Sequence, residues 1–422
     1  MMSHSPLARS EAGLAYAFLL PPLAVVISIV LVPVLANFWI SFKAVELSDL
    51  RPPKPIVKLQ ISKWPKKHGD PIIFQYRLRN SSQKLPLNKI LIRQKLPAGM
   101  LVQETDSRCT ISENEIQCIY DNWPAKYREN FEVIFETKDG SNVSKKEIKS
   151  IKPKLKGKSD NILLNTKFTL KNFKKVLFEN EFIDLLLTTF YYTFFGTVGS
   201  IVFGILTAQM VNQKFFGRTF MRSVLLFPYV APVVALAYTW ELLLDPNSGT
   251  LNSLLINYQI IETPINLLGQ KYIAVNILGF DFKLRLALTT VIIFEIWRYF
   301  PLAFLFILAR LQAIPKELYE AADVDGASPF QKFFKITLPQ ITAVISILFM
   351  IRFIWNFNKF EDVFLLTGGA SGTRTLPINV YQQGFAISDI GTGSAVSIVI
   401  VILLLLFMFF YFKLLGKRVD EN

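Results

Sequence analysis

The chain has 422 residues, of which 51% are hydrophobic and 18% are charged, and its formal net charge is +14. Soluble domains usually hold about 25% charged residues, so this composition favours a membrane protein. Between Lys43 and Lys175 there are 28 Lys and Arg but only 14 Asp and Glu, so this segment carries the whole excess of positive charge. Because no zinc-finger spacing or other nucleic-acid motif accompanies it, the charge indicates a basic extramembrane domain and argues against a nucleic-acid partner.

Six apolar blocks follow one another along the chain, and each is long enough to cross a bilayer as a helix of about 20 residues. They lie near 15–42, 183–211, 221–244, 284–309, 340–366 and 392–415. Lipid-facing backbone must satisfy its own hydrogen bonds, so blocks of this length are predicted to be helical. The first block is longer than the core of a signal peptide and is followed by no convincing cleavage site, so we expect it to stay as a helix. Its prolines predict kinks at Pro21, Pro22 and Pro33.

Basic residues in the short loops predict the orientation, because cytoplasmic loops are enriched in Lys and Arg. The segments on one side of a six-helix topology carry Arg9, then Lys214, Arg218 and Arg222, then Arg310, Lys316, Lys332 and Lys335, then Lys413, Lys417 and Arg418. This predicts a plasma (inner) membrane protein with both termini in the cytoplasm and with 43–180, 245–283 and 367–391 outside. Lys283 and Arg285 lie on the other side and conflict mildly with this orientation.

The segment from about 50 to 165 has a different pattern. Polar and apolar residues alternate at 72–79, 89–94 and 131–136, which predicts strands of a small antiparallel sandwich. With its YRLRNSS, LPAGM and FEVIFE stretches, this segment resembles the immunoglobulin-like repeat domains of bacterial surface proteins. The Lys-rich run 145–158 is predicted to be a solvated tether, with contact to an anionic surface as the alternative.

The only two cysteines, Cys109 and Cys118, flank a hairpin-like stretch in this segment. In an oxidising compartment they are expected to form a disulfide, and two free buried thiols are the alternative.

The loop IPKELYEAADVDGASPFQKFFKITLPQI follows the fourth apolar block. Pro315 suits the first turn of a helix, and Leu318, Ala321 and Ala322 fall on one face of that helix. Gly326 is a suitable stop, because glycine adopts left-handed backbone conformations freely. A second short segment at 329–336 is expected next, and Pro339 is expected to open the fifth membrane helix. These features predict a compact helix–turn–helix on the cytoplasmic side.

The loop resembles the signature loop of permease subunits of ABC importers. The matching residues are Glu320, Ala321, Ala322, Gly326, Ile336, Leu338 and Pro339. FGRTFMRSVLLFPYVAPVVALAYTWELLLDP and FNKFEDVFLLTGG resemble the sugar-permease branch, of maltose and glycerol-phosphate type. The resemblance implies a pore half that pairs with a second, homologous permease, sets its signature loop on one of two ATPase subunits and receives solute from an extracytoplasmic binding protein.

Several residues become candidates for solute contact through this resemblance. The stretch 352–359 is similar to the maltose-type segment that lines the sugar site. The candidates are Arg298, Tyr299, Leu302, Arg352, Trp355, Asn356 and Lys359. Core packing is the alternative for each of them. Glu295 and Arg298 lie three residues apart, close enough to pair, and internal ion pairs are the expected role of Glu361 and Asp362.

The predicted fold is therefore an all-α, six-helix ABC importer permease bundle with an inserted extracytoplasmic, immunoglobulin-like β-sandwich. It comprises the N-terminus and first helix (1–43), the insert with its tether (44–180) and a core permease domain (181–422) that contains the EAA loop (311–339). The expected cargo is a sugar, polyol or glycosyl-glycerol solute, with a glycerol phosphate as the alternative. A membrane-anchored adhesion or sensor protein and an ABC exporter are the rival classes.

No catalytic or metal-binding constellation is recognisable in the sequence. A phosphate-binding G-x-x-x-x-G-K-[ST] loop is also missing, so ATP and Mg are expected in a partner ATPase and no cofactor is expected in this chain.

Overall fold

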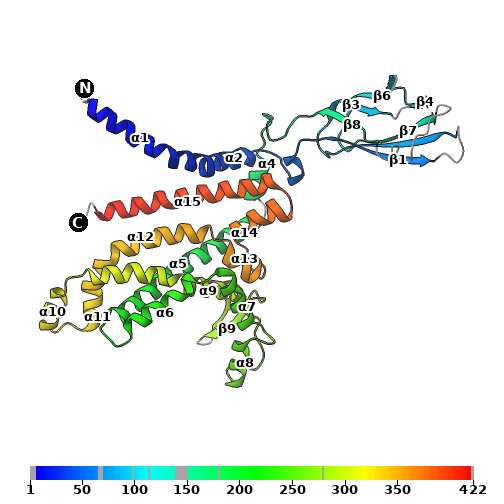
Figure 1. Ribbon diagram of the computed structural model, residues 1–422. Coiled ribbons are helices and arrows are strands. Elements are labelled where there is room, and N and C mark those ends of the chain that lie inside the picture. The colour runs from blue at the N-terminus through cyan, green and yellow to red at the C-terminus, as the bar shows by residue number, and fades with distance from the viewer. Residues whose placement is uncertain are drawn as a thin grey trace. The chain divides into compact units, whose positions relative to one another are not determined.

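The computed structural model describes residues 6–64, 70–96, 99–112, 115–137, 151–178, 181–277 and 280–419 (Figure 1). The chain divides into two compact units. A helical unit holds the residues up to 41, 171–387 and those from 392 onward, and a sheet unit holds 42–170 and 388–391.

The helical unit contains long apolar helices joined by short segments. Its helices are α1 (Pro6–Val26), α2 (Val32–Ser41), α4 (Lys171–Phe178), α5 (Phe182–Asn212), α6 (Arg218–Val230), α7 (Val233–Leu243), α8 (Thr250–Asn257), α9 (Leu286–Gln312), α10 (Glu317–Val324), α11 (Pro329–Lys332), α12 (Leu338–Phe357), α13 (Glu361–Thr367), α14 (Leu376–Tyr381) and α15 (Ile390–Val419). Five helices among the described residues are long and apolar enough to cross a membrane, and α6 with α7 forms a bent pair that raises the number to six if it counts as one span.

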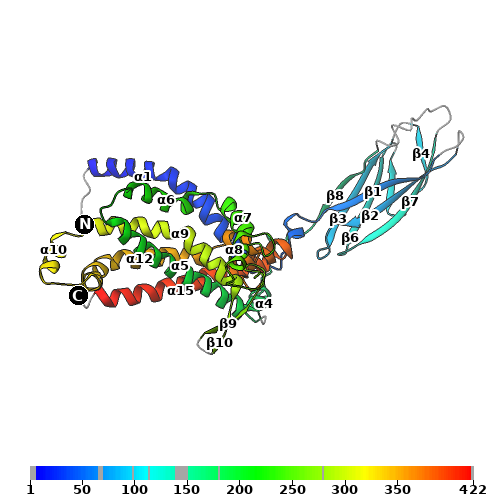
Figure 2. The ribbon, with the colours of Figure 1, turned by 90° about the horizontal axis from the view of Figure 1, so that it is seen from below.

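The centre of this unit is formed by α5, α9 and α12, which pack along one another (Figures 1 and 2). A Cβ added at Gly204 of α5 would lie only 2.6 Å from the Cβ of Ala303 and 2.9 Å from the backbone nitrogen of Phe304 on α9. Only glycine therefore permits this helix contact. Both views place α10 and the C-terminal end of α15 at one end of the unit, and α8 with the hairpin β9 (Ile273–Ile277) and β10 (Phe280–Leu284) at the other.

The apolar block 221–244, predicted to be one helix, forms two. The structure has α6 and α7 there, and they meet at an angle of 93°. Between them, Ala231 has an extended backbone (φ −67°, ψ 145°), because the following Pro232 disfavours helical geometry in the residue before it.

The predicted bounds of the fifth membrane helix, 340–366, are also wrong. A single helical segment runs from Pro329 to Phe357, and α13 is a separate helix. Pro339 lies in the first turn of α12, as expected from the sequence, but α12 continues from α11 through a π-helical turn at Phe333–Thr337. Proline has no N–H to donate to the preceding turn, and wider helical turns absorb such breaks.

The first apolar block is helical along its length. A π-helical turn at Ile27–Leu31 separates α1, which contains Pro21 and Pro22, from α2, which contains Pro33. The span Leu14–Ser41 has none of its most apolar window buried within the protein, so this surface is available for lipid or for another helix.

Two four-stranded antiparallel sheets form the sheet unit (Figure 2). Its strands are β1 (Pro55–Lys63), β2 (Ile72–Asn80), β3 (Leu87–Lys95), β4 (Met100–Glu104), β5 (Cys109–Ser112), β6 (Glu115–Trp123), β7 (Arg128–Thr137) and β8 (Lys154–Lys158). One sheet has the order β1-β2-β7-β4 and the other β5-β6-β3-β8. Alternate residues of both sheets, among them Phe74, Ile90, Trp123 and Phe135, bury their side chains in one hydrophobic core between the sheets.

Cys109 and Cys118 are directly opposite each other on β5 and β6 and form a disulfide. The two thiols are therefore not free, and the bond ties the edge strand β5 to its neighbour.

The prediction of a tether over 145–158 is wrong for its last five residues, while 145–150 lie outside the described residues. Residues 154–158 form β8, which pairs with β3. Ile151 and Leu155 pack against the core of the sheet unit, and these apolar contacts let a Lys-rich segment join the sheet.

The two ends of the sheet unit are held together by a buried lysine. The ammonium group of Lys43 donates hydrogen bonds to the Oδ1 of Asn165 and to the carbonyl of Lys167, both at 3.1 Å. The backbone N–H of Thr169 bonds to the carbonyl of Phe42 at 2.8 Å. Entry and exit of the chain therefore lie side by side, which is the arrangement expected of an inserted domain.

Candidate functional site

The first candidate site is the elbow, which we define as residues 315–339. Its first helix, α10, ends at Val324 with Asp325 as its C-cap, and Gly326 follows with a left-handed backbone (φ +71°). The side chain of Ser328 then accepts a hydrogen bond from the backbone of Gln331, whose own side chain bonds back to the N–H of Ser328. This capping box starts α11, so the turn has a defined stop and a defined start.

A hydrogen bond closes the elbow from within. The hydroxyl groups of Tyr319 on α10 and Thr337 lie 2.9 Å apart. An ion pair between Lys332 and Asp323 joins the two arms of the turn. The elbow is therefore a folded unit. Pro315 lies just before α10 and not in its first turn, which corrects the predicted helix start by two residues.

Several large apolar side chains are exposed on the elbow. Val324 is 88% exposed, Phe330 78% and Phe334 58%. Glu320, Ala321, Gly326 and Pro339 are exposed, and Ala322 and Leu338 are half-buried. Large exposed apolar residues gathered on one short element mark a surface that contacts another protein or the membrane.

The second candidate site is a group of charged residues and one tyrosine at α9, α12 and α13, all buried or nearly so except Glu361, which we call the charge cluster. Its members are Glu295, Arg298, Tyr299, Arg352, Lys359, Glu361 and Asp362. Glu295, Arg298 and Tyr299 share one face of α9, because they are three and four residues apart.

The ion pairs of the charge cluster connect different helices. Arg352 on α12 pairs with Glu295 on α9, and Arg298 lies 2.6 Å from Asp362 on α13. The prediction that Glu295 pairs with Arg298 is therefore wrong. Each of these four side chains contacts a buried or nearly buried side chain of opposite charge on another helix. That partner compensates its charge better than a residue on its own helix would.

Lys359 pairs with Glu361 at 3.0 Å and lies 3.7 Å from Asp362. Glu361 and Asp362 thus form internal ion pairs, as expected from the sequence.

Tyr299 lies at the centre of the charge cluster. Its hydroxyl accepts a hydrogen bond from Arg298 at 2.8 Å and contacts the ammonium group of Lys359. The guanidinium of Arg352 and the ammonium of Lys359 each lie 4.1 Å from the centre of its ring. Three cations therefore share one aromatic side chain, and each such contact is worth about 0.5–2 kcal/mol.

Asn356 lies one turn beyond Arg352 on α12 and is 1% exposed. Its amide nitrogen donates to the hydroxyl of Thr197 on α5 at 3.2 Å, while its Oδ1 has no hydrogen-bond partner among the described residues. Arg352 likewise has two unpaired nitrogen atoms, Nε and Nη1, in the described part of the chain. Buried polar atoms of this kind are uncommon and are typical of functional sites.

Five of the seven candidate solute residues therefore lie together, and two do not. Trp355 is 51% exposed on α12, and Leu302 is half-buried on α9. Sequence reasoning missed Thr197 and Tyr192, whose hydroxyl lies 3.2 Å from Glu295. Both are on α5, and the only available signal was a run of Thr and Tyr within an otherwise apolar helix.

The charges of the charge cluster balance. Arg298, Arg352 and Lys359 supply three positive charges, and Glu295, Glu361 and Asp362 supply three negative ones. Within the ranges that the structure describes, no group of three or more His, Cys, Asp or Glu residues could hold a metal ion.

The comparisons with known proteins decide the family. Residues 200–421, which include the elbow and the charge cluster, match the family of the binding-protein-dependent transport system inner membrane component. The chain belongs to this family. Its relatives include the inner membrane ABC transporter permease protein YcjO of Escherichia coli K12, which is 34% identical over 229 residues, or 54% of this chain and 73% of YcjO.

Two further relatives carry the names of their transport systems. The trehalose/maltose transport system permease protein MalF of Thermococcus litoralis is 32% identical over 230 residues, which cover 54% of this chain and 73% of that protein. The sn-glycerol-3-phosphate transport system permease protein UgpA of Escherichia coli O157:H7 is 30% identical over 233 residues, with the same coverage of 54% and 73%.

A solved structure supports the same fold. A chain of a bacterial ABC transporter involved in the import of the acidic polysaccharide alginate matches with a TM-score of 0.53 and 22% identity, over 61% of this chain and 86% of that chain. The helical unit is therefore an ABC permease fold.

Proposed function

We propose that this chain is one transmembrane permease subunit of an ABC importer and that it moves a sugar, polyol or glycosyl-glycerol solute across the inner membrane. Its partners in this proposal are a second homologous permease, two ATPase subunits that bind ATP and Mg, and an extracytoplasmic solute-binding protein. The observation that carries the proposal is the exposed, apolar elbow within a chain that belongs to the family of binding-protein-dependent inner membrane components.

In this proposal the elbow docks on an ATPase subunit. The residues that transmit the motion are Glu320, Ala321, Ala322, Gly326, Leu338 and Pro339. Val324 and Phe330 supply the apolar contact area, and the continuous helix Pro329–Phe357 carries a displacement of the elbow to Arg352 of the charge cluster and to the neighbouring Asn356. A rigid helix suits this role, because it moves as one body.

We also propose six membrane spans with both termini in the cytoplasm and the sheet unit outside the membrane as an immunoglobulin-like domain. The location of α10 and of the C-terminal end of α15 at one end of the helical unit supports a cytoplasmic end (Figure 1). The disulfide supports an oxidising, extracytoplasmic environment for the sheet unit.

The charge balance favours a neutral solute over a glycerol phosphate. A phosphate ester needs an excess of cationic donors, and here each cation already has a carboxylate partner. In this conformation Arg352 and Asn356 are buried, so solute reaches them only when α9 and α12 separate. Transport by the purified complex tests the choice of solute: uptake of a phosphate ester with no response to neutral sugars would reject it.

The test of the coupling role is Gly326→Val, with Gly217→Val as its control. Both glycines have positive φ, and a Cβ at either position would meet no atom within 4 Å, so both changes impose the same backbone strain in open space. This strain costs about 1–2 kcal/mol at each position. We expect Gly326→Val to abolish transport and the solute-stimulated part of ATP hydrolysis, while Gly217→Val keeps at least half of both. Equal activity of the two variants would contradict the proposal.

A further inference from the structure

The outward face of the sheet β5-β6-β3-β8 carries a row of cations. Lys154, Lys156 and Lys158 alternate with Leu155 and Gly157 along β8, and all three lysines are exposed. Leu155 is opposite Ile92, a core residue of β3, so the lysines on either side of it point away from the core. Alternate residues of a strand lie about 7 Å apart, so the row is about 14 Å long.

Like charges face each other across the two strands. Arg93 on β3 is directly opposite Lys154 on one side and Gln117 of β6 on the other, so no carboxylate stands directly across from it. Arg93, Lys154, Lys156 and Lys158 form no ion pair among the residues that the structure describes. A directly opposite pair of like charges destabilises a sheet, by up to about 1 kcal/mol. The fold therefore gains nothing from this arrangement.

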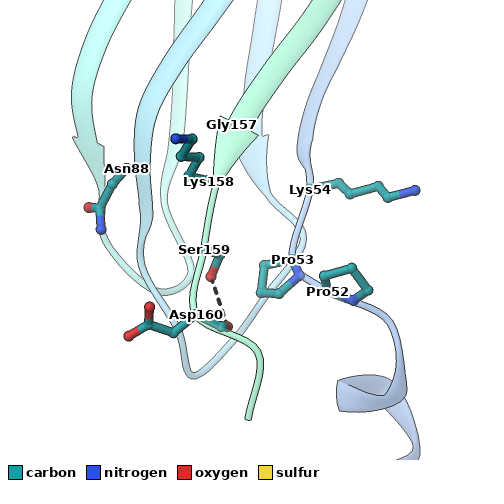
Figure 3. Close-up of a pocket in the computed structure, with 8 residues that line it drawn as sticks. All are labelled: Pro52, Pro53, Lys54, Asn88, Gly157, Lys158, Ser159 and Asp160. Atoms are coloured by element: carbon teal, nitrogen blue, oxygen red, sulfur yellow. Dashed lines mark hydrogen bonds between the residues drawn. The ribbon is translucent and has the colours of Figure 1, made fainter. Parts of the chain in front are cut away.

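A hollow of about 460 Å³ lies at the end of the row, between the segments 52–54 and 157–160 (Figure 3). Figure 3 shows Lys54 and Lys158 pointing to opposite sides of it, so their ammonium groups do not converge on a common ligand. The hollow is thus no anion pocket, and the extended row is the feature that needs an explanation.

We propose that Arg93, Lys154, Lys156 and Lys158, here named the cationic row, bind a linear polyanion, carboxylated or phosphorylated, that lies along β8. Charges spaced along an exposed edge strand match an extended chain with repeated negative groups better than a compact anion, which needs converging donors. Leu91 is opposite Lys156 and adds an apolar contact beside the row. The inference rests on the proposed extracytoplasmic location of the sheet unit, where such polymers belong to the cell envelope.

Protection of a sheet edge is the alternative explanation, because lysines on edge strands prevent pairing between molecules. Charge reversal separates the two roles. Glu at positions 154, 156 and 158 protects the edge as well as Lys does, and it turns the repulsion between Arg93 and residue 154 into attraction. A triple variant K154E/K156E/K158E should therefore fold and stay monomeric, but it should lose affinity for a polyanion.

The experiment uses the full chain in nanodiscs of zwitterionic lipid, with oligogalacturonate and polyphosphate as probes and, separately, with vesicles of anionic lipid. The matched control is K58E/R77E/R79E, which changes the net charge equally on the outward face of the other sheet, where Glu132 also lies. We expect the wild type to bind at least one probe. Its affinity should fall as the salt concentration is raised from about 50 to 200 mM, because the release of counterions drives such binding. Reversal of the cationic row should lower affinity at least tenfold, and the control should lower it less than threefold.

Three outcomes would overturn the proposal. They are no binding of either probe by the wild type, equal losses in the two variants, and binding confined to vesicles of anionic lipid. None of these measurements needs ATP, a partner subunit or transport. The polyanion proposal can therefore fail while the importer function stands, and the importer function can fail while polyanion binding stands.

Discussion

The guanidinium of Arg298 on α9 lies 2.6 Å from the carboxylate of Asp362 on α13, and Asp362 is fully buried. A buried carboxylate needs partners on every side, because taking its charge out of water costs several kcal/mol. Asp362 has Arg298 on one side and Lys359, 3.7 Å away, on the other. This pair therefore holds α13 to α9.

Removing the charge of Asp362 should destabilise the helical unit. We expect Asp362→Asn to lower the free energy of unfolding by about 3 kcal/mol, because two cations lose their shared partner. Glu361→Gln is the matched control. Glu361 pairs with the same Lys359 at 3.0 Å but is 47% exposed, so its loss should cost less than about 1 kcal/mol. Thermal unfolding in detergent measures both, and equal shifts would show that burial is not the decisive factor.

The sequence predicted four of the six apolar helices and the glycine stop of the elbow, because both depend on local patterns. Apolar blocks must be helical in lipid, and Gly326 has the left-handed backbone that its place after α10 requires. The strands with clean alternation, β2, β3 and β7, also lie where the pattern indicated.

Contacts between residues far apart in the chain could not be predicted from the sequence. Glu295 has a partner 57 residues away, Arg352, although Arg298 lies only three residues from it, and nothing local distinguishes the two. The strand β8 was missed because Leu155 is its only large apolar residue. The 93° bend between α6 and α7 was missed because Pro232 could equally have kinked a continuous span.

Gly204 allows α5 and α9 to approach each other, so a methyl group there should separate them. We expect Gly204→Ala to lower the free energy of unfolding by about 1–3 kcal/mol, the usual cost of overpacking. A Cβ at Gly384 would meet no atom within 4 Å, so Gly384→Ala should stay within about 1 kcal/mol of the wild type. Comparison of the two unfolding temperatures tests this, and a stable Gly204→Ala variant would refute the close contact.

The disulfide should stabilise the sheet unit. Replacing both Cys109 and Cys118 by Ser should lower the free energy of unfolding by about 2–3 kcal/mol, because the bond closes a short loop in the unfolded chain. Urea unfolding of the full chain, followed by limited proteolysis within the sheet unit, measures the loss. Reduction of the wild-type protein should reproduce it, and it should leave the double variant unchanged. A shift of the variant under reducing conditions would assign the effect elsewhere.

Arg108 makes the stability of the sheet unit depend on pH. It donates hydrogen bonds to Asp106 at 2.6 Å and to Glu129 at 2.6 Å, and these bonds lower the pKa of both carboxyl groups. A carboxyl group whose pKa is depressed on folding stabilises the folded state above its unfolded pKa of about 4, and this contribution is lost as the pH falls through the folded pKa. Stability should therefore be constant from pH 8 to pH 5 and fall below about pH 4.

Hydrogen exchange of the segment 106–129, corrected for intrinsic exchange rates, measures this dependence in the full chain. Arg108→Gln is the matched variant, because it keeps a polar side chain of similar length but removes the charge that depresses both pKa values. We expect it to exchange faster at pH 7 and to lose most of the change between pH 5 and pH 3. Because Arg108 is 37% exposed, water screens its interactions and the effect at pH 7 should be modest. If wild type and variant lost protection in parallel below pH 4, other carboxyl groups would set the acid sensitivity.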